Sequence, residues 1–323
     1  MKWLKLFVLV VVLFGCKEKP HEELLAKNVS VSSLPGSETT LVILGTIQDA
    51  GSPHIACKKD CCAYLFCNPM SNRKVVSLGI VDPESQKTFL FEATPDITTQ
   101  LKMLRQFSSS EDELPDGIFL THAHIGHYSG LMYLGKEAAN ADHLPVYAMP
   151  RMKDFLESNG PWSQLVTNNN IDLVSLENNH RVQISSNVAI IPFRVPHRDE
   201  FSETIGYRII GPNKTALFIP DIDKWEMWDT DISEVISQVD YAFLDATFFN
   251  GDEIDSRDIS EIPHPFIIES MKKFQGLSIS EKNKIYFIHF NHTNPMLDQE
   301  SEARKLVLKN GFNVAQIHEL FKL

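Results

Sequence analysis

The sequence lacks the motifs by which several large enzyme classes are recognised. It contains no glycine-rich dinucleotide fingerprint, no Walker loop and no Gly-x-Ser-x-Gly elbow, so nothing in it points to a nucleotide-binding enzyme or a serine hydrolase. Positive charge is scarce: 30 Lys and Arg face 42 Asp and Glu, which gives a formal net charge of −12. Because an acidic surface repels phosphate backbones and no basic run offsets it, we expect no nucleic-acid partner.

The apolar run near the N-terminus is too short to cross a bilayer. Residues 6–14 are apolar, whereas a membrane-spanning helix needs about 20 such residues. The run follows Lys2 and Lys5, as in a secretory signal peptide, and ends in Leu13-Phe14-Gly15-Cys16, which resembles a bacterial lipobox. Cleavage before Cys16 and lipidation of its thiol would anchor the mature protein to a membrane; plain secretion is the alternative.

These features divide the chain into an export signal, a tether and one folded part. The polar stretch before position 40 contains prolines and a glycine, which predicts a tether between anchor and domain. We expect a location in the bacterial cell envelope, on the periplasmic or outer face of a membrane. The predicted boundaries are 1–15 for the lipoprotein signal peptide, 16–39 for the lipidated cysteine and tether, and 40–323 for the folded domain.

Cysteine is rare, and four of the five cysteines lie within a few residues of one another. They are Cys57, Cys61, Cys62 and Cys67, and only Cys16 lies elsewhere. In an exported protein an even set predicts disulfides, whereas the short spacing equally suits a structural zinc held by thiolates. The adjacent pair Cys61 and Cys62 is awkward for either arrangement, so both alternatives stay open.

Three histidines follow a short apolar segment in the middle of the chain. His122, His124 and His127 come directly after a predicted buried strand at 118–121. In an extended segment the side chains of His122 and His124 point to the same side, and a helix predicted from 126 to 137 can turn His127 back toward them. Neutral imidazole is the commonest metal ligand, and three converging rings suit zinc, iron or manganese.

This pattern resembles the metal-binding signature of the metallo-β-lactamase-fold superfamily, His-x-His-x-Asp-His, with Gly126 in place of the aspartate. The resemblance implies an α/β fold, an αββα sandwich of two mixed β-sheets flanked by helices. In the family the first two histidines serve one metal, and the aspartate and third histidine serve a second. Without a carboxylate at 126 the second site is short of ligands, so we expect one tightly held ion or a weak second ion, and a rise in metal content on Gly126→Asp.

The resemblance continues in the second half of the chain, where candidate ligands again follow apolar strands. His197 and His289 match family histidines, and Asp221 matches the aspartate that bridges two metals. Asp223 is the competing assignment, but it lies two residues deeper into its loop. The predicted metal ligands are therefore His122, His124, His127, His197, Asp221 and His289.

Three further residues are expected near this site. Asp49, in the loop after the first strand, either supplies the missing carboxylate or caps its own loop, which is the commoner role of an aspartate there. His264, between two prolines, either faces the substrate pocket or is a solvated loop residue. His292 follows three residues after His289 and is a candidate ligand or general acid. The candidate catalytic residues are Asp221, Asp49 and His292.

The leading functional hypothesis is a lipid-anchored, metal-dependent hydrolase. One or two zinc ions, with iron or manganese as alternatives, would activate water to attack a small-molecule ester, lactam, thioester or phosphodiester. The Leu-Gly opening, the glycine–proline loop, the cysteine cluster and the run Asn-x-Thr-Asn-Pro at 291–295 also resemble the pyrroloquinoline-quinone biosynthesis protein B family. That resemblance implies a structural zinc on the cysteines and, as the alternative function, an iron-dependent oxygenase. A third hypothesis is a metal- or ligand-binding lipoprotein without catalysis.

Overall fold

The protein is described here by a computed structural model that covers residues 36–70, 72–254 and 262–323. The predicted signal peptide, Cys16 and the tether up to residue 35 lie outside these residues. None of the helices in the covered part of the chain has the length and hydrophobicity needed to span a bilayer.

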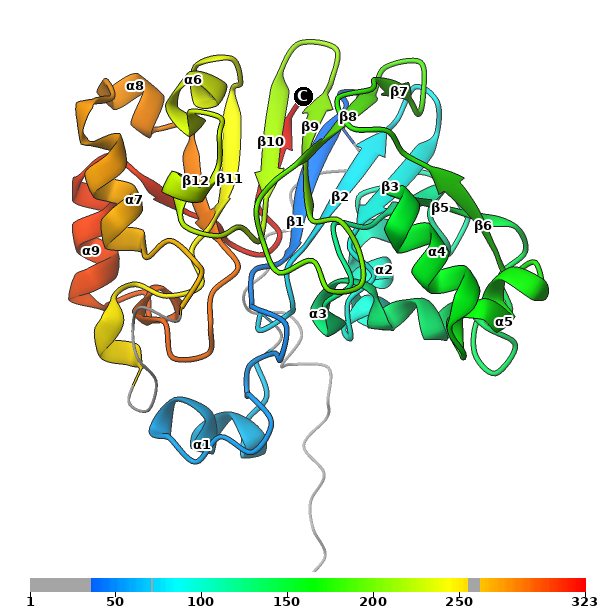
Figure 1. The fold of residues 1–323 in the computed structure, drawn as a ribbon, viewed down its shortest axis with the longest axis horizontal. Coiled ribbons are helices and arrows are strands. Elements are labelled where there is room, and N and C mark those ends of the chain that lie inside the picture. The colour runs from blue at the N-terminus through cyan, green and yellow to red at the C-terminus, as the bar shows by residue number, and fades with distance from the viewer. Residues whose placement is uncertain (1–35, 71, 255–261) are drawn as a thin grey trace, which may run out of the picture. The chain divides into compact units, whose positions relative to one another are not determined.

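Two seven-stranded sheets form the centre of the fold (Figure 1). The first sheet has the order β14-β1-β2-β3-β4-β5-β6 and the second has the order β13-β12-β11-β10-β9-β8-β7. The strands of the first are β1 (Thr40–Gly45), β2 (Ser77–Asp82), β3 (Lys87–Phe91), β4 (Gly117–Phe119), β5 (Leu144–Ala148), β6 (Ile171–Ser175) and β14 (Leu320–Lys322). Those of the second are β7 (Val182–Gln183), β8 (Ala189–Arg194), β9 (Ile205–Ile210), β10 (Thr215–Ile219), β11 (Tyr241–Asp245), β12 (Ile285–Ile288) and β13 (Asn313–Val314).

Both sheets are mixed. In the first sheet β1, β2 and β3 pair antiparallel and β3 to β6 pair parallel. In the second sheet β7 to β10 pair antiparallel and β10 to β13 pair parallel. Neighbouring parallel strands end at the same edge of their sheet, so the loops that follow β10, β11 and β12 begin side by side.

Helices cover the outer face of each sheet. Those that pack on the first sheet are on the opposite side of Figure 1 from those that pack on the second. The helices are α1 (Asp60–Cys67), α2 (Ile97–Arg105), α3 (Ile125–Tyr128), α4 (Pro150–Ser158), α5 (Trp162–Thr167), α6 (Ile232–Ser237), α7 (Ile267–Lys273), α8 (Ile279–Lys282) and α9 (Glu302–Lys309).

Alternation along the strands explains why the sheets are buried on both faces. In β1, Leu41 and Ile43 point into the core between the two sheets, whereas Val42 and Leu44 point toward the helices on the outside. The inner core joins both sheets through aromatic side chains such as Phe91, Tyr207 and Phe218. The αββα sandwich predicted from the sequence is therefore confirmed.

The helix predicted at 126–137 is wrong in its length. Only Ile125–Tyr128 is α-helical, and a 3-10 helix continues from Ser129 to Leu134. The cause lies at Gly130, where a Cβ would come within 2.1 Å of the carbonyl oxygen of Thr94. Gly130 N also donates a hydrogen bond to Ala93 O at 2.8 Å. This close contact between backbones holds the segment against the loop after β3 in a tighter turn.

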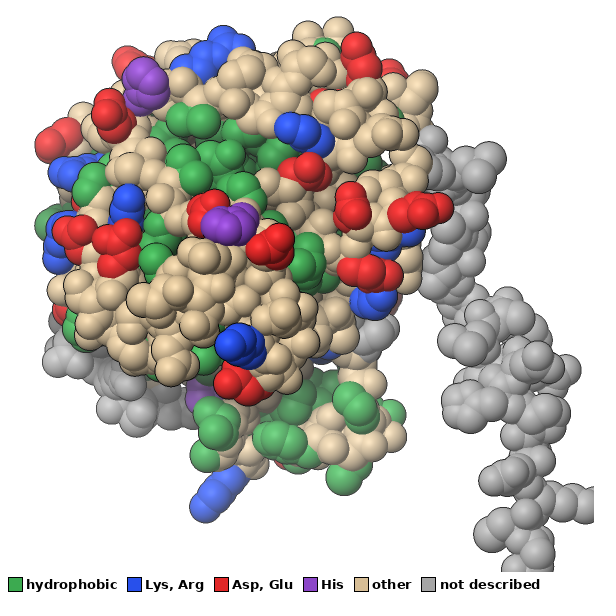
Figure 2. Space-filling view, turned by 90° about the vertical axis from the view of Figure 1, so that its right-hand side faces the viewer, with side chains coloured by type: hydrophobic (Ala, Val, Ile, Leu, Met, Phe, Trp, Pro, Cys, Tyr) green, Lys and Arg blue, Asp and Glu red, His purple; other side chains and the backbone are tan. Residues whose placement is uncertain are grey.

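The segment around α1 has little packing of its own. Of its eight residues only Cys62 and Leu65 are buried. Figure 2 shows hydrophobic side chains gathered on this part of the surface, at the bottom of the view, and the exposed large ones are Ile55, Tyr64, Phe66 and Met70. Because a short helix gains most of its stability from tertiary contacts, α1 needs another means of attachment.

Candidate metal centre

The segments that follow five strands, and the last residue of a sixth, bring ligand side chains to one place. β1 leads to Asp49, β4 to the three motif histidines, β8 to His197, β10 to Asp221, and β12 to His289. β11 ends in Asp245, which lies beside the same cluster. Ligands that are far apart in the sequence meet because β1 and β4 run in the same direction in the first sheet, as β8, β10, β11 and β12 do in the second, so these strands end at the same edge of their sheet.

The first group of potential ligands consists of His122, His124, His197 and Asp221. One donor atom from each lies within 4.8 Å of the others. His122 Nε2 and His197 Nε2 are each 3.3 Å from an oxygen of Asp221, and His122 Nε2 is 2.9 Å from His124 Nδ1. Three imidazoles and one carboxylate in this arrangement suit a divalent zinc, iron or manganese ion.

The second group consists of Asp49, His127, Asp221 and His289, so Asp221 belongs to both groups. His127 Nε2 is 2.8 Å from Asp49 Oδ1, and His289 Nε2 is 3.9 Å from the same oxygen. The buried atoms Asp49 Oδ1, His127 Nε2, Asp221 Oδ1 and His289 Nε2 make no well-formed hydrogen bond in the described parts of the chain, although ion-pair contacts join them to one another and to neighbouring histidines. Buried polar atoms usually make well-formed hydrogen bonds, so four that converge without one fit a cation between them.

Burial and neighbouring charge set the protonation of these groups. Burial disfavours the charged form of Asp221, but the imidazoles of His197, His264 and His289 hold its pKa well below the usual value. Burial and the charge of His127 lower the pKa of His122 well below its usual value. A charged Asp221 and a neutral His122 are the forms in which these side chains bind metal.

The ring nitrogens that face away from the cluster also have polar neighbours. Such outer contacts fix the orientation of metal-binding histidines and tune their basicity. They are Thr121 Oγ1 at 2.9 Å from His122 Nδ1, Asp223 Oδ1 at 2.9 Å from His197 Nδ1, Thr247 Oγ1 at 3.0 Å from His289 Nδ1 and Glu92 Oε1 at 3.5 Å from His127 Nδ1. Asp223 thus lies behind His197, and Asp221 is the aspartate that faces the cluster.

Two residues of this cluster have strained backbones. His289 has a φ of 69° and Glu92 a φ of 74°, in the left-handed region that residues other than glycine rarely adopt. Backbone strain of this kind concentrates at functional sites, where surrounding structure holds it. Sequence reasoning did not identify Glu92; an acidic residue at the end of the apolar strand β3 is the signal that could have drawn attention to it.

His264 faces the cluster and is not a solvated loop residue. Its Nδ1 lies 2.9 Å from Asp245 Oδ2 and 3.1 Å from Asp221 Oδ1, and the side chain is 14% exposed. Burial disfavours its cation, but the carboxylates of Asp245 and Asp221 raise the pKa of His264 well above its usual value. Thr247 Oγ1 donates a hydrogen bond to Asp245 Oδ1 at 2.7 Å and fixes the carboxylate from behind.

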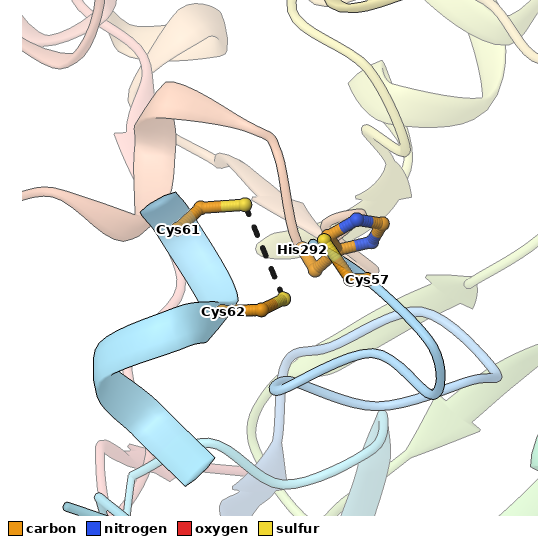
Figure 3. Close-up of side chains that lie close together, drawn as sticks. All are labelled: Cys57, Cys61, Cys62 and His292. Carbon is orange, nitrogen blue, oxygen red and sulfur yellow. Dashed lines mark hydrogen bonds between the residues drawn. The ribbon is translucent and has the colours of Figure 1, made fainter. Parts of the chain in front are cut away.

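His292 does not join this cluster, contrary to its predicted role as ligand or general acid there. It lies with Cys57, Cys61 and Cys62, and one donor atom of each is within 4.8 Å of the others (Figure 3). Its ring packs against that of His54 with the centroids 4.4 Å apart and the ring planes tilted by 35°. Burial and the charges of His54 and Lys59 lower its pKa to about 4, so the imidazole is neutral and free to bind a metal.

Cys67 is not part of this group. Cys61 and Cys62 lie in the first turn of α1 and Cys67 is its last residue, so the helical rise separates Cys67 from them by about 7 to 9 Å along the axis. All four cysteines of this segment are free thiols in the structure. The set of four cysteines expected from the sequence is thus replaced by three cysteines and one histidine, which is a common ligand set for structural zinc.

Comparisons with known proteins agree with this geometry. Residues 87–290, more than half of the chain, match the family model described as the beta-lactamase superfamily domain. The chain is 23% identical over 305 residues to coenzyme PQQ synthesis protein B of Methylorubrum extorquens strain PA1, which covers 85% of this chain and 97% of that protein.

Two solved structures show the same fold. The zinc-bound PqqB from Methylobacterium extorquens superposes with a TM-score of 0.73 at 21% identity, covering 88% of this chain and 100% of the other. A diphosphatase from the PhnP family superposes with a TM-score of 0.59 at 20% identity, covering 88% and 97%. The chain therefore belongs to the beta-lactamase superfamily, has the metallo-β-lactamase fold, and is similar to the PQQ synthesis protein B along nearly all of its described length.

Proposed function

We propose that this protein is a metal-dependent hydrolase of a small anionic substrate. The observation that carries the proposal is the sharing of Asp221 by two groups of buried ligands, each able to hold one divalent ion. Zinc is the ion that we propose, because three imidazoles and a carboxylate are common zinc ligands. Held by these residues, zinc would supply a coordinated water with a pKa of about 7 and would polarise the carbonyl or phosphoryl group under attack.

The side chains around the cluster would then bind the metal ions, protonate the leaving group and orient the metal ligands. Asp221 holds both positions together and is kept ionised by the surrounding histidines. His264 is held by Asp245 through Nδ1, which leaves Nε2 to give a proton to the leaving group. Asp223 and Thr121 keep His197 and His122 turned toward the cluster.

An arginine at the rim is a candidate contact for an anionic substrate. Arg198 Nη2 lies 3.4 Å from His124 Nε2, so its guanidinium borders the first group of ligands, and Glu200 Oε1 lies 3.8 Å from its Nη1. A planar guanidinium recognises carboxylates and phosphates through paired hydrogen bonds. The diphosphatase with the same fold supports a substrate attacked at a phosphoryl group, as the phosphodiester is, over the carboxylic ester, lactam and thioester alternatives. The net charge of −12 argues against a nucleic acid.

The second candidate is the iron-dependent oxygenase that the resemblance to the quinone-biosynthesis family implies, and the chain is similar to coenzyme PQQ synthesis protein B. Histidines and carboxylates with open coordination positions also suit ferrous iron. The two candidates differ in a measurable way, because an oxygenase consumes O₂ with its substrate and a hydrolase does not.

We also propose that three cysteines and His292 hold a structural zinc ion, and that Cys16 is lipidated. The first rests on the convergence of these four side chains at the weakly packed α1. The second rests on the lipobox-like sequence alone. Expression of the full chain with Cys16→Ser tests the anchor: the variant should leave the membrane fraction, and its retention there would contradict lipidation.

The main experiment measures metal content and activity of the purified protein on a panel of phosphodiester, carboxylic ester, lactam and thioester substrates. We expect zinc-dependent hydrolysis that chelation abolishes and zinc restores. His197→Ala should lose both metal and activity, whereas Lys136→Ala, at an exposed position, should keep them. Iron with substrate-dependent O₂ uptake would replace the hydrolase by the oxygenase, and a folded protein whose histidine cluster binds no metal would refute both.

A further inference from the structure

Gly126 and Asp49 compete for the same space. A Cβ at position 126 would lie 2.4 Å from the Cα of Asp49 and 2.4 Å from its Oδ1. Distances this short to a backbone atom cannot be relieved by turning a side chain, so any other residue at 126 must push the Asp49 loop away. The glycine therefore leaves open the volume that the aspartate fills.

The loop that carries Asp49 is fixed beside the segment of His289. Gln48 N donates a hydrogen bond to Phe290 O at 2.9 Å, and Phe290 N donates one to Thr46 O at 2.8 Å. Gly51, with a φ of 78°, closes the loop through a hydrogen bond from its N to Gln48 O at 2.9 Å. These contacts are between backbones. They therefore position Asp49 beside the other residues of the second group independently of the conformations of neighbouring side chains.

The alternative role of Asp49, as a cap of its own loop, does not match its contacts. Within the described residues its side chain accepts no hydrogen bond from the loop backbone, and the buried Oδ1 makes no well-formed hydrogen bond with any other group. That oxygen instead lies 2.8 Å from His127 Nε2 and 3.9 Å from His289 Nε2. Without Asp49, the second group would consist of two histidines and Asp221. The carboxylate of Asp49 adds a second negatively charged ligand to this group.

We propose that Asp49 is the carboxylate ligand of the second metal position, in place of the aspartate that the superfamily motif carries at position 126. The inference rests on the proposed metal centre and adds to it that the ligand has moved from the motif to the loop after β1. A glycine at position 126 is then needed to leave room for Asp49. With Asp49 as a ligand, the second metal position needs no further protein ligand. Gly126→Asp, which the sequence led us to expect would raise metal content, should instead displace Asp49 and not raise it.

The test compares the zinc stoichiometry and affinity of the wild-type protein with those of Asp49→Ala, Gly126→Ala and the double variant. We expect each single variant to lose one ion per chain, or at least about 100-fold in affinity at that position, because even outer contacts of a ligand are worth about 10- to 100-fold. Gly126→Ala changes no charge, so its effect can come only through displacement. The double variant should bind like either single one, because both remove the same ligand.

Glu200→Gln is the matched control. Glu200 Oε2 lies 3.8 Å from His124 Nε2 on the exposed rim, so the variant removes a nearby negative charge without touching the second group. It should keep both ions. Circular dichroism and thermal melting of every variant show whether the fold is retained.

Two outcomes would overturn the assignment of Asp49: folded Asp49→Ala keeps the second ion, or the histidine cluster of the wild-type protein binds only one ion. Either outcome would leave the first metal position and the hydrolase proposal in place. Retention of the second ion by Gly126→Ala would overturn the mutual exclusion of the two residues. Absence of any ion from the histidines of the wild-type protein would instead refute the proposed function.

Discussion

His197 Nδ1 lies 2.9 Å from Oδ1 of Asp223, two residues beyond the aspartate that faces the metal cluster. The same imidazole presents Nε2 to Asp221 at 3.3 Å. The two aspartates of one short loop therefore take different roles: one can bind metal and the other orients a ligand. Asp223 N donates a hydrogen bond to Pro196 O at 2.7 Å, which ties the two loops together at this point.

Removal of this orienting carboxylate should weaken the first metal position. For Asp223→Ala we expect a loss of about 10- to 100-fold in zinc affinity, as for other outer contacts of metal-binding histidines. A chelator-competition titration measures it. Asp229→Ala removes an exposed carboxylate farther along the same segment and should change nothing. Equal affinities for Asp223→Ala and wild type would mean that His197 is oriented by its backbone alone.

The cysteine group should depend on His292 and not on Cys67. His292→Ala is expected to lose one zinc ion per chain and to make the α1 segment more susceptible to proteolysis, because only two residues of α1 are buried. Cys67→Ser is the control and should keep the full zinc content. Elemental analysis together with limited proteolysis provides both readouts. Loss of zinc from Cys67→Ser with retention by His292→Ala would restore the four-cysteine set.

His264 should contribute to turnover without holding metal. If it gives a proton to the leaving group, His264→Ala should lower kcat by about 10²- to 10⁴-fold, with a smaller loss for substrates whose leaving group needs no proton. Metal content should stay at the wild-type value. A parallel loss of metal would show that His264 is a ligand together with Asp221 and Asp245, which also lie within binding distance of one another.

A carboxylate far from the metal centre should make the stability of the fold sensitive to acid. Asp82 is fully buried at the end of β2 and accepts hydrogen bonds from Ser85 Oγ at 2.6 Å, Ser185 Oγ at 2.6 Å and Asn187 Nδ2 at 3.0 Å. Burial raises its pKa, but these hydrogen bonds outweigh burial and lower it below the usual value. Ser185 and Asn187 belong to the β7–β8 turn, so the contact joins the two sheets.

Because the folded-state pKa is lowered, the stabilisation by Asp82 is complete above its unfolded-state pKa of about 3.9 and is lost as the pH falls through the folded-state value. Asp82→Asn should lower the free energy of unfolding by about 2 kcal/mol at neutral pH, the usual contribution of hydrogen bonds to a charged group. Urea denaturation at a series of pH values should show this difference narrowing below about pH 4. Exposed Asp154→Asn serves as the control, and a difference that does not vary with pH would contradict the ionised state of Asp82.

The sequence by itself indicated the class of fold and six candidate ligands through the resemblance of its motifs to those of the superfamily. Strand-length apolar segments followed by a histidine or aspartate agree with that resemblance, because a side chain just past a strand end has a fixed place at the edge of its sheet. The candidates His122, His124, His127, His197, Asp221 and His289 were named because they match the superfamily motifs, and the structure brings them together.

Only the tertiary structure revealed the roles of residues that depend on contacts between segments distant in the sequence. Asp49 and Gly126 are 77 positions apart, and no local pattern reveals that one occupies the space left by the other. His292 lies three residues after a ligand of the metal centre, yet the chain turns there and carries it to the cysteines of α1. Such contacts are set by how the two sheets pack, and packing is a property of the whole chain and not of any one segment.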